Sequence, residues 1–335
     1  MVEYGENMNN SIKVSVIVPI YNSAEFMTKC LDSLTAQTLD SMEVIMVNDG
    51  SKDNSLAVMR EYEKKYPGVF KAFDKPNGGV ADARNYGLKQ AAGEFIGFVD
   101  SDDCVEPSFF EKLYNGAVRY GADICAGNVI EIIGSEDNVH VQDRIRQEGV
   151  ISLIETPEKV RLCRPYLWNK VIRRSIFTED NLFPYGMYYE DVAVIYGILF
   201  TADRIALVPD VHYTYRRLRG DSISNSSDEK AFDVFRACDI IEERAHRMND
   251  YSRIGEVIQW VILVHIFTRV KRAYDDGNKR FKLEFIERAY SYLDEKFPGW
   301  KRNRYYFANK KNLIFRSKTL AKLVFVYCNF LPVKM

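Results

Sequence analysis

Few histidines and no paired cysteines restrict the metal and redox chemistry open to this chain. Its 335 residues include only four histidines, and the six cysteines form no CxxC pair. Because zinc sites take Cys and His ligands at close spacing, the scattered histidines argue against zinc. A disulfide framework is also not expected in a chain of this length, so we interpret the cysteines as reduced cytosolic thiols.

Long apolar runs are also missing. No stretch approaches the roughly 18–20 apolar residues needed to span a bilayer, and residues 1–11 are polar, without the apolar core of a secretory signal. We therefore expect a cytoplasmic protein, with at most peripheral contact at the inner face of the cell membrane.

A basic excess is absent as well, because the formal net charge is −1. This argues against a nucleic-acid partner. The charge is unevenly distributed, however: residues 301–335 contain nine Lys/Arg and no Asp or Glu, whereas the rest carries 37 basic and 47 acidic residues. Such a tail suggests an anionic partner, such as a membrane surface. A terminal helix packed on the body, with its lysines in water, is an equally good interpretation.

Two glycine-rich nucleotide motifs do not occur after the first expected strand. That loop contains neither GxGxxG nor GxxxxGK[ST], so a dinucleotide fingerprint and a P-loop are not expected. Nucleotide binding would instead require carboxylates and a metal ion.

The hydrophobic pattern predicts alternating strands and helices in the first part of the chain. The expected strands are 14–19, 43–47, 69–73, 95–99 and 123–133, and the expected helices are 24–38, 53–66, 80–92 and 107–120. This order predicts an α/β fold with a doubly wound, mostly parallel sheet. Strands at 167–172, 205–208 and 211–215 and a helix at 192–200 follow, and from residue 228 the chain is helical. We expect a first domain at 12–225, with halves 12–133 and 134–225, and a helical region at 226–335.

An acidic cluster ends the expected strand at 95–99. Asp100, Asp102 and Asp103 follow it directly, and ligands of open α/β sheets bind beyond the carboxyl ends of strands. One interpretation is a divalent metal at Asp100 and Asp102, completed by phosphate oxygens of a substrate. The other is an acidic turn that caps the helix near Pro107.

Polar residues follow two other strands of the same sheet. Tyr21 and Asn22 lie after the first strand and Asp49 ends the second. Because these strand ends share one edge with Asp100 and Asp102, we expect all of these residues to serve one ligand.

Two further segments carry charge suited to catalysis. Glu190 and Asp191 lie at the start of the apolar helix 192–200, where the helix dipole keeps a carboxylate ionised, as a base requires. A plain helix cap explains them as well. The basic segment 216–220, with nearby Ser222, suits a diphosphate, and the alternative is a solvated turn. His265 lies in an apolar run and is interpreted as a core residue.

Together these motifs resemble the inverting glycosyltransferases of family 2, which have the GT-A fold, and the resemblance covers about residues 12–225. The matching segments are 16–22 (VIVPIYN), 47–53 (VNDGSKD), 77–87 (NGGVADARNYG), 100–103 (DSDD) and 189–191 (YED). The chain departs from the family at Asn48, where the family usually has Asp. Segments 168–170, 183–184 and 213–224 resemble the subgroup that builds bacterial surface polysaccharides.

The resemblance implies metal-dependent inverting transfer from a nucleotide sugar, with a UDP-sugar favoured, to a hydroxyl of a glycan or lipid-linked glycan. It assigns nucleotide binding to Pro19, Tyr21, Asn22, Asp49, Gly79, Arg84, Asp100 and Ser101. It assigns Mn²⁺ or Mg²⁺ to Asp102 with Asp100, and proton abstraction to Asp191. It associates Glu190, Trp168, Lys170, Arg216, Arg219 and Ser222 with the acceptor or the diphosphate. Transfer to a polyprenyl phosphate, glycoside hydrolysis by paired carboxylates, and a non-catalytic sugar-nucleotide-binding subunit are the alternatives.

Overall fold

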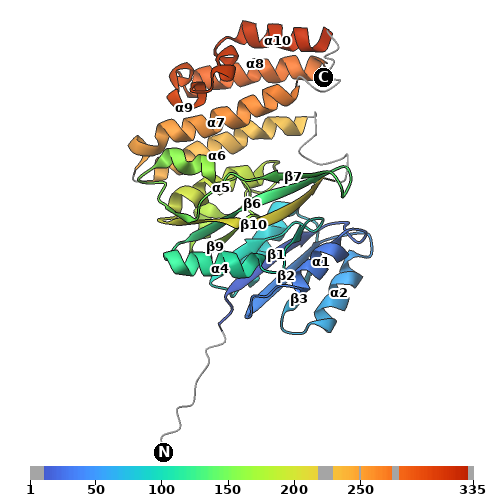
Figure 1. The fold of residues 1–335 in the computed structure, drawn as a ribbon. Helices are drawn as coiled ribbons and strands as arrows, with labels where there is room; N and C mark the ends of the chain where they lie inside the picture. Colours follow the sequence, from blue (N-terminus) through green and yellow to red (C-terminus); the bar gives the residue numbers. More distant parts are fainter. Residues whose placement is uncertain (1–10, 218–228, 249, 274–278, 331–335) are drawn as a thin grey trace, which may run out of the picture. The chain divides into compact units, whose positions relative to one another are not determined.

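The computed structural model describes residues 11–217, 229–248, 250–273 and 279–330 (Figure 1). They form two compact units. The first unit comprises the described residues of Met1–Ser152, Arg161–Gly186 and Thr201–Leu218, and the second those of Leu153–Val160, Met187–Phe200 and Arg219–Met335. The predicted domain boundary at 225/226 lies outside the described residues and stays a prediction.

A ten-stranded sheet forms the centre of the first unit. Its strands are β1 (Val14–Ile20), β2 (Met42–Asp49), β3 (Phe70–Lys75), β4 (Phe95–Phe98), β5 (Cys104–Val105), β6 (Ile124–Ile133), β7 (Val139–Gln142), β8 (Gly149–Ile151), β9 (Lys170–Arg173) and β10 (Ile205–Arg217). The order is β3-β2-β1-β4-β9-β6-β10-β5, with β7 beside β6 and β8 beside β10. Strands β3, β2, β1 and β4 are parallel neighbours, as are β6 and β10, whereas β9 is antiparallel to β4 and β6. The predicted doubly wound, mostly parallel sheet is confirmed.

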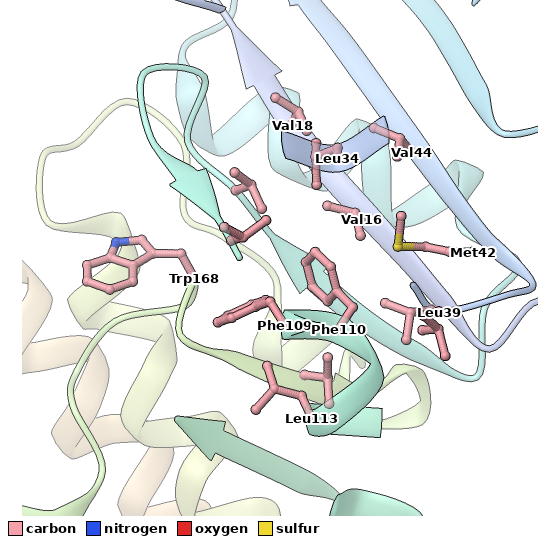
Figure 2. Packing of buried hydrophobic residues seen from close by; sticks show 14 of the residues in the cluster. Val16, Val18, Leu34, Leu39, Met42, Val44, Phe109, Phe110, Leu113 and Trp168 are labelled. Atoms are coloured by element: carbon pink, nitrogen blue, oxygen red, sulfur yellow. The ribbon is translucent and has the colours of Figure 1, made fainter. Parts of the chain in front are cut away.

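Helices cover both faces of this sheet. They are α1 (Met27–Thr35), α2 (Ser55–Lys65), α3 (Val80–Gln90) and α4 (Phe109–Tyr120). Successive side chains of a strand point to opposite faces. Accordingly, Val16 and Val18 of β1 join the cluster that includes Leu34 of α1 and Phe110 of α4 (Figure 2). Each such buried side chain contributes about 1.5–3 kcal/mol relative to an exposed one.

Helix α3 lies on the opposite face, against Ile17 of β1. A Cβ atom at Gly87 of α3 would lie 2.5 Å from Ile17 Cγ2, closer than any ordinary contact. The glycine of the 77–87 motif therefore permits this close helix–strand approach, which fixes the start of α3 beside the ends of β1 and β2.

Strand β10 differs from the sequence prediction. Two short strands were expected, but the chain forms one strand, whose pairing with β6 shifts between Leu207 and His212. Pro209 lies within this shift, and proline has no N–H to donate to a ladder. The break in the hydrophobic pattern therefore marks a bulge rather than a turn. The strand predicted at 167–172 is also different in the structure. The observed strand is β9, which begins only at Lys170, and residues 167–169 form a loop before it.

The second unit is helical, as the pattern after residue 228 predicted. Its helices are α5 (Glu190–Thr201), α6 (Asp233–Arg247), α7 (Tyr251–Ala273), α8 (Lys279–Lys296), α9 (Arg304–Phe307) and α10 (Lys318–Phe330). Helix α7 packs against both α6 and α8 (Figure 1). Within the described residues, no helix combines the length and apolarity needed to cross a membrane.

Candidate active site

The loops after β1 and β2 are tied together at one edge of the sheet. The amide of Asn22 donates to Ser51 Oγ at 3.0 Å, and Asn22 Oδ1 accepts from the amide of Lys52 at 2.8 Å. Asn22 adopts φ +48°, a conformation that asparagine tolerates better than most residues. The neighbouring Tyr21 is 50% exposed, so its ring is available to a ligand at this edge.

A hydroxyl pair connects the loop after β1 with the loop after β4. The Oγ atoms of Ser23 and Ser101 lie 2.8 Å apart, and both residues are buried. The amide of Ser23 also donates to Ser55 Oγ at 2.9 Å. Three sequence-distant loops are therefore held together where the parallel strands end. That their residues serve one ligand stays a prediction.

The carboxylate of Asp49 is buried and organises the 75–79 loop. Its Oδ1 atom accepts from Lys75 Nζ at 2.5 Å and from the amide of Gly78 at 2.9 Å. Its Oδ2 atom accepts from the amide of Gly79 at 2.8 Å and from Asn77 Nδ2 at 3.2 Å. The Gly79 backbone has φ +86°, which favours glycine. Three of the four donors (Asn77, Gly78 and Gly79) belong to the 77–87 segment that resembles the family, and the fourth is Lys75 at the end of β3.

Arg84 and Asp100 form an ion pair at the same edge. The Nη2 atom of Arg84 lies 3.2 Å from Asp100 Oδ1; the side chain of Arg84 is 8% exposed and that of Asp100 is 31% exposed. The neighbouring Asn85 exchanges two hydrogen bonds with the backbone of Phe183, whose ring lies 5.5 Å from the Arg84 guanidinium. The 77–87 motif therefore places a buried cation beside a carboxylate that solvent can reach.

Asp103 is fully buried and bonded to strand β10. Its Oδ2 atom accepts from the Tyr213 hydroxyl at 2.8 Å, and its Oδ1 atom accepts from the amide of Arg216 at 2.8 Å. The Tyr213 hydroxyl in turn accepts from the amide of Asp100 at 3.1 Å. Burial, followed by the charges of Asp100 and Asp102, raises the pKa of Asp103 well above its usual range.

These contacts correct the helix-cap interpretation of the acidic cluster for Asp103. Helix α4 begins at Phe109 after Ser108, whose side chain makes no capping bond. The amide of Phe109 bonds instead to the carbonyl of Glu106 at 3.0 Å. Both carboxylate oxygens of Asp103 point to β10, which pairs with the strand that directly follows Asp103, so this residue fixes the acidic loop to the sheet.

Arg216 lies against the other side of the acidic loop. Its Nη1 atom donates to the carbonyl of Asp102 at 3.3 Å, and its Nη2 atom pairs with Glu136 at 2.5 Å. Glu136 also pairs with Lys29 at 2.8 Å. The guanidinium of Arg216 thus contacts the acidic loop through protein oxygens, and its predicted contact with a diphosphate stays a prediction.

Trp168 stacks with tyrosines rather than lying open to solvent. Its ring centroid lies 4.3 Å from that of Tyr166 and 4.2 Å from that of Tyr213, with nearly parallel planes, and 5.5 Å from that of Tyr215. The indole is 7% exposed. This stack supports the Tyr213 ring, whose hydroxyl holds Asp100 and Asp103.

Lys170 is fully buried within a ring of oxygens. Its ammonium donates to the carbonyl of Arg164 at 3.2 Å, to Asn169 Oδ1 at 2.5 Å, and to the carbonyl of Tyr166. Burial lowers the pKa of Lys170 to about 7. The predicted contact of Trp168 and Lys170 with an acceptor or diphosphate stays a prediction.

The predicted base belongs to the second unit. Asp191 lies in the first turn of α5, and its Oδ1 atom accepts from the amide of Val192 at 2.7 Å. Glu190 is buried at the start of the same helix. Both carboxylates thus lie where the helix dipole favours negative charge.

Three predicted site residues remain to be placed: Pro19, Arg219 and Ser222. Pro19 lies in β1, in register with Val47 of β2, one residue before the end of the strand. Arg219 and Ser222 lie outside the described residues.

Sequence reasoning missed Lys75 and Tyr213. Lys75 ends β3, next to the end of β2, and it pairs with both Asp49 and Asp82 at 2.5 Å. Tyr213 is an apolar-face position of β10, which the strand prediction included without a role. Lys75 could have been found from the strand order: β3 runs parallel to β2, so the last residue of β3 lies beside Asp49 at the end of β2.

Known proteins resemble this chain in sequence and fold. A family model described as glycosyl transferase family 2 matches residues 15–180. Glycosyltransferase GlyG of Streptococcus pneumoniae is 31% identical over 255 residues, which cover 72% of this chain and 81% of GlyG. The Escherichia coli K12 protein named uncharacterized glycosyltransferase YibD is 31% identical over 218 residues, 62% of each chain. The chain thus spans less than two thirds of YibD.

A solved structure shares the fold across both units. TarS of S. aureus (residues 1–349), solved in complex with UDP-GlcNAc, has a TM-score of 0.73 at 20% identity, covering 93% of this chain and 91% of that one. The sheet order and the acidic loop after β4 define a protein of the GT-A glycosyltransferase class. The chain belongs to glycosyltransferase family 2.

Proposed function

We propose that this chain transfers a sugar from a UDP-sugar to a hydroxyl of a glycan or lipid-linked glycan, with inversion, in polysaccharide biosynthesis. Membership of family 2 supports sugar transfer. The relative named glycosyltransferase GlyA, at 32% identity, supports sugar transfer, and the one named minor teichoic acid biosynthesis protein GgaB, at 30% identity, supports an acceptor in cell-surface polymer synthesis.

This proposal rests mainly on the difference between two carboxylates of the acidic loop, one of which is buried and bonded while the other is accessible. Asp103 is buried and bonded through both oxygens to β10, whereas the Asp100 side chain is about one-third exposed beside the buried Arg84. A carboxylate kept accessible next to a cation, on a loop held rigidly by its neighbour, suits an anionic ligand that arrives with a metal ion.

The residues of this loop fit a divalent cation. Among the described residues, no group of three or more His, Cys, Asp or Glu side chains could hold a metal. Mg²⁺, however, is usually bound by one or two carboxylates together with substrate phosphates and water. Asp100 and Asp102 supply that number of hard oxygen ligands, which suit Mn²⁺ or Mg²⁺. A cation held there would neutralise negative charge on the diphosphate leaving group.

The chain's own residues account for binding of the nucleotide in this proposal. Tyr21 offers a half-exposed ring on which a base can stack. Asp49 offers a carboxylate for an imino N–H of the base. Because Asp49 already accepts four bonds from the 75–79 loop, a base reaches its oxygens only when one of those bonds opens. Arg84 adds positive charge for the diphosphate.

Asp191 takes the proton from the attacking hydroxyl in this proposal. The start of α5 stabilises its ionised form, and a single base with a single displacement inverts the anomeric carbon. Positioning of the two sugars supplies much of the remaining rate.

A donor screen tests the proposal. Release of UDP from a panel of UDP-sugars, with Mn²⁺ and with or without a lipid-linked acceptor pool, should identify one productive donor. Asp102→Ala should abolish the Mn²⁺-dependent part of UDP affinity in calorimetry, whereas Asp137→Ala, an exposed carboxylate in the turn before β7, should not. Asp191→Asn should retain UDP affinity but lose transfer by a factor of about 10²–10⁴, the range of general-base catalysis. Unchanged Mn²⁺-supported affinity in Asp102→Ala would remove the metal role.

Contact with an anionic membrane surface is the second part of the proposal, and it rests on the apolar edge of α10. Leu320 and Leu323 are exposed there, the latter by 59%. The charge of the tail is partly neutralised, because Lys318 and Lys322 both pair with Glu287 of α8. The leucines are therefore the principal support for membrane contact, and the lysines contribute less than the sequence suggested.

A further inference from the structure

Helices α6 and α7 contact the segment that carries Asp191, although they lie outside the residues matched by the family model. We propose that Asp233 of α6 and Arg269 of α7 are positioning residues that hold the Tyr188–Tyr189 turn and so fix the orientation of Asp191. The proposal rests on the role of Asp191 as base proposed above. It assigns a catalytic contribution to a helical region in which the sequence carried no motif.

The first contact is a hydrogen bond from the turn to α6. The amide of Tyr188 donates to Asp233 Oδ2 at 2.8 Å, and Asp233 is the first residue of α6. The ring of the same tyrosine lies 4.8 Å from Lys230 Nζ. Tyr188 is thus held through both its backbone and its side chain, three residues before Asp191.

The second contact involves the residue with the least favourable backbone of this segment. Tyr189 has φ +64°, a conformation that costs a non-glycine residue of order 1–3 kcal/mol and persists only where its surroundings enforce it. The guanidinium of Arg269, a residue that is 8% exposed, lies 5.4 Å from the centroid of its ring. The Tyr189 ring also packs against the buried cluster of Met187, Ala193 and Ala237.

The turn leads directly into α5. The carbonyl of Tyr189 accepts from the amide of Ala193 at 3.0 Å, which closes the first turn of that helix around Glu190 and Asp191. A change in the backbone of Tyr189 would therefore rotate the carboxylate of Asp191. Displacement of a catalytic group by about 1 Å can cost about 10²-fold in rate.

Two further contacts fix α5 itself to the same pair of helices. Arg244 of α6 donates to the carbonyl of Ala193 at 3.2 Å, and His265 Nε2 of α7 lies 2.9 Å from the Tyr196 hydroxyl. These contacts hold the body of α5, and the Tyr188–Tyr189 turn holds its start, where Asp191 lies.

Steady-state kinetics of the full chain test this role, with matched variants on the same helices. Asp233→Ala and Arg269→Met remove the two contacts. Asp239→Ala removes another half-buried carboxylate of α6, which accepts from Tyr292 of α8 at 3.0 Å. Lys271→Met removes a cation of α7 that lies 5.2 Å from the ring of Phe315. Asp239→Ala matches Asp233→Ala in residue type and partial burial. Lys271→Met removes a cation from the same helix as Arg269, but Lys271 is exposed where Arg269 is buried. Both control residues contact segments other than the Tyr188–Tyr189 turn.

We expect kcat to fall about 10- to 100-fold in Asp233→Ala and Arg269→Met, the cost of a displacement of about 1 Å, with KM for the UDP-sugar unchanged. Asp233→Asn, which keeps an acceptor oxygen, should recover most of the rate. Hydrogen exchange in peptides covering 187–193 should accelerate in Asp233→Ala, because the Tyr188 amide loses its acceptor, and should stay unchanged in both controls.

Three outcomes would contradict the proposal, and one would contradict only its basis. The positioning role fails if both test variants keep wild-type kcat, if both controls lose as much kcat as they do, or if kcat falls only in proportion to the unfolded fraction. If Asp191→Asn itself transfers sugar at the wild-type rate, the role of Asp191 as base fails instead.

Discussion

The hydroxyl of Tyr213 lies between the amide of Asp100 and the carboxylate of Asp103. It accepts from the former at 3.1 Å and donates to the latter at 2.8 Å. One phenol from β10 thereby fixes both ends of the acidic loop, and the Trp168 ring, stacked 4.2 Å away, fixes the phenol. Asp103, to which the metal interpretation assigned no role, thus has a structural role that keeps its neighbours in position.

Tyr213→Phe should weaken the proposed metal and diphosphate site without unfolding the chain. The change removes both bonds of the hydroxyl, each of which contributes about 1 kcal/mol net, and leaves the stacked ring in place. We expect lower Mn²⁺-dependent affinity for UDP, measured by calorimetry, with thermal unfolding lowered by only a few degrees.

Tyr215→Phe provides the matched control for this prediction. It makes the same change two residues further along β10, against the same Trp168 ring. Equal losses of UDP affinity in both variants, or no loss in Tyr213→Phe, would show that the hydroxyl of Tyr213 does not organise the loop.

Lys75→Met should destabilise the chain far more than loss of a surface lysine. Lys75 pairs at 2.5 Å with the buried carboxylate of Asp49, and breaking a buried pair costs about 3–5 kcal/mol because a charge is left uncompensated. Lys13 pairs with the exposed Asp40 at 2.8 Å, and such surface pairs contribute about 0–1 kcal/mol. Urea denaturation of Lys75→Met and Lys13→Met compares the two directly, and equal midpoints would contradict the prediction.

Much of the fold and part of the site could be predicted from the sequence. Parallel strands are buried on both faces, so β1 and the strand before Asp100 appear as continuous apolar runs, and their order places the acidic loop and Asp49 at one edge. The bond between Tyr213 and Asp103 joins residues 110 positions apart. It depends on β10 lying antiparallel to β5, a pairing that periodicity does not encode.

The roles of Lys170 and of the C-terminal helices could not be predicted from the sequence either, because they also depend on contacts that only the folded chain makes. A lysine in an amphipathic run suggests a solvent-facing cation. In the structure, oxygens of the segment just before β9 surround the ammonium of Lys170. Likewise, Asp233 is an unremarkable helix-start residue until the Tyr188 amide is seen to donate to it.

The buried Lys170 predicts a pH dependence of stability. Its pKa is about 7 in the folded chain and about 10.4 in the unfolded chain. Between these values the unfolded chain binds a proton that the folded chain has lost, so raising the pH favours the folded state. Its contribution to the free energy of unfolding should rise by about 1.4 kcal/mol per pH unit from pH 7 toward pH 10.

Comparison with Lys170→Met separates the contribution of Lys170 to the free energy of unfolding from those of other groups that titrate at alkaline pH. The variant leaves three oxygens without a donor and should be less stable overall, but the difference in slope between pH 7.5 and 9 reports Lys170 alone. Chemical denaturation at several pH values measures both quantities. Parallel stability curves for the two proteins would mean that Lys170 keeps its proton throughout this range, held by its three acceptors.

Leu320 and Leu323 supply the last prediction, which separates membrane contact from packing of the tail. Replacing both with Ser removes exposed apolar area while leaving the pairs of Lys318 and Lys322 with Glu287. If α10 lies in a bilayer interface, binding to vesicles containing anionic lipid should fall sharply, because interfacial helices bind through buried apolar area as well as charge. Leu283→Ser, at an exposed leucine of α8, is the control and should bind like the wild type. Should the double variant sediment with vesicles as the wild-type chain does, α10 serves only to cover α8, and any membrane contact must arise from charge elsewhere on the protein.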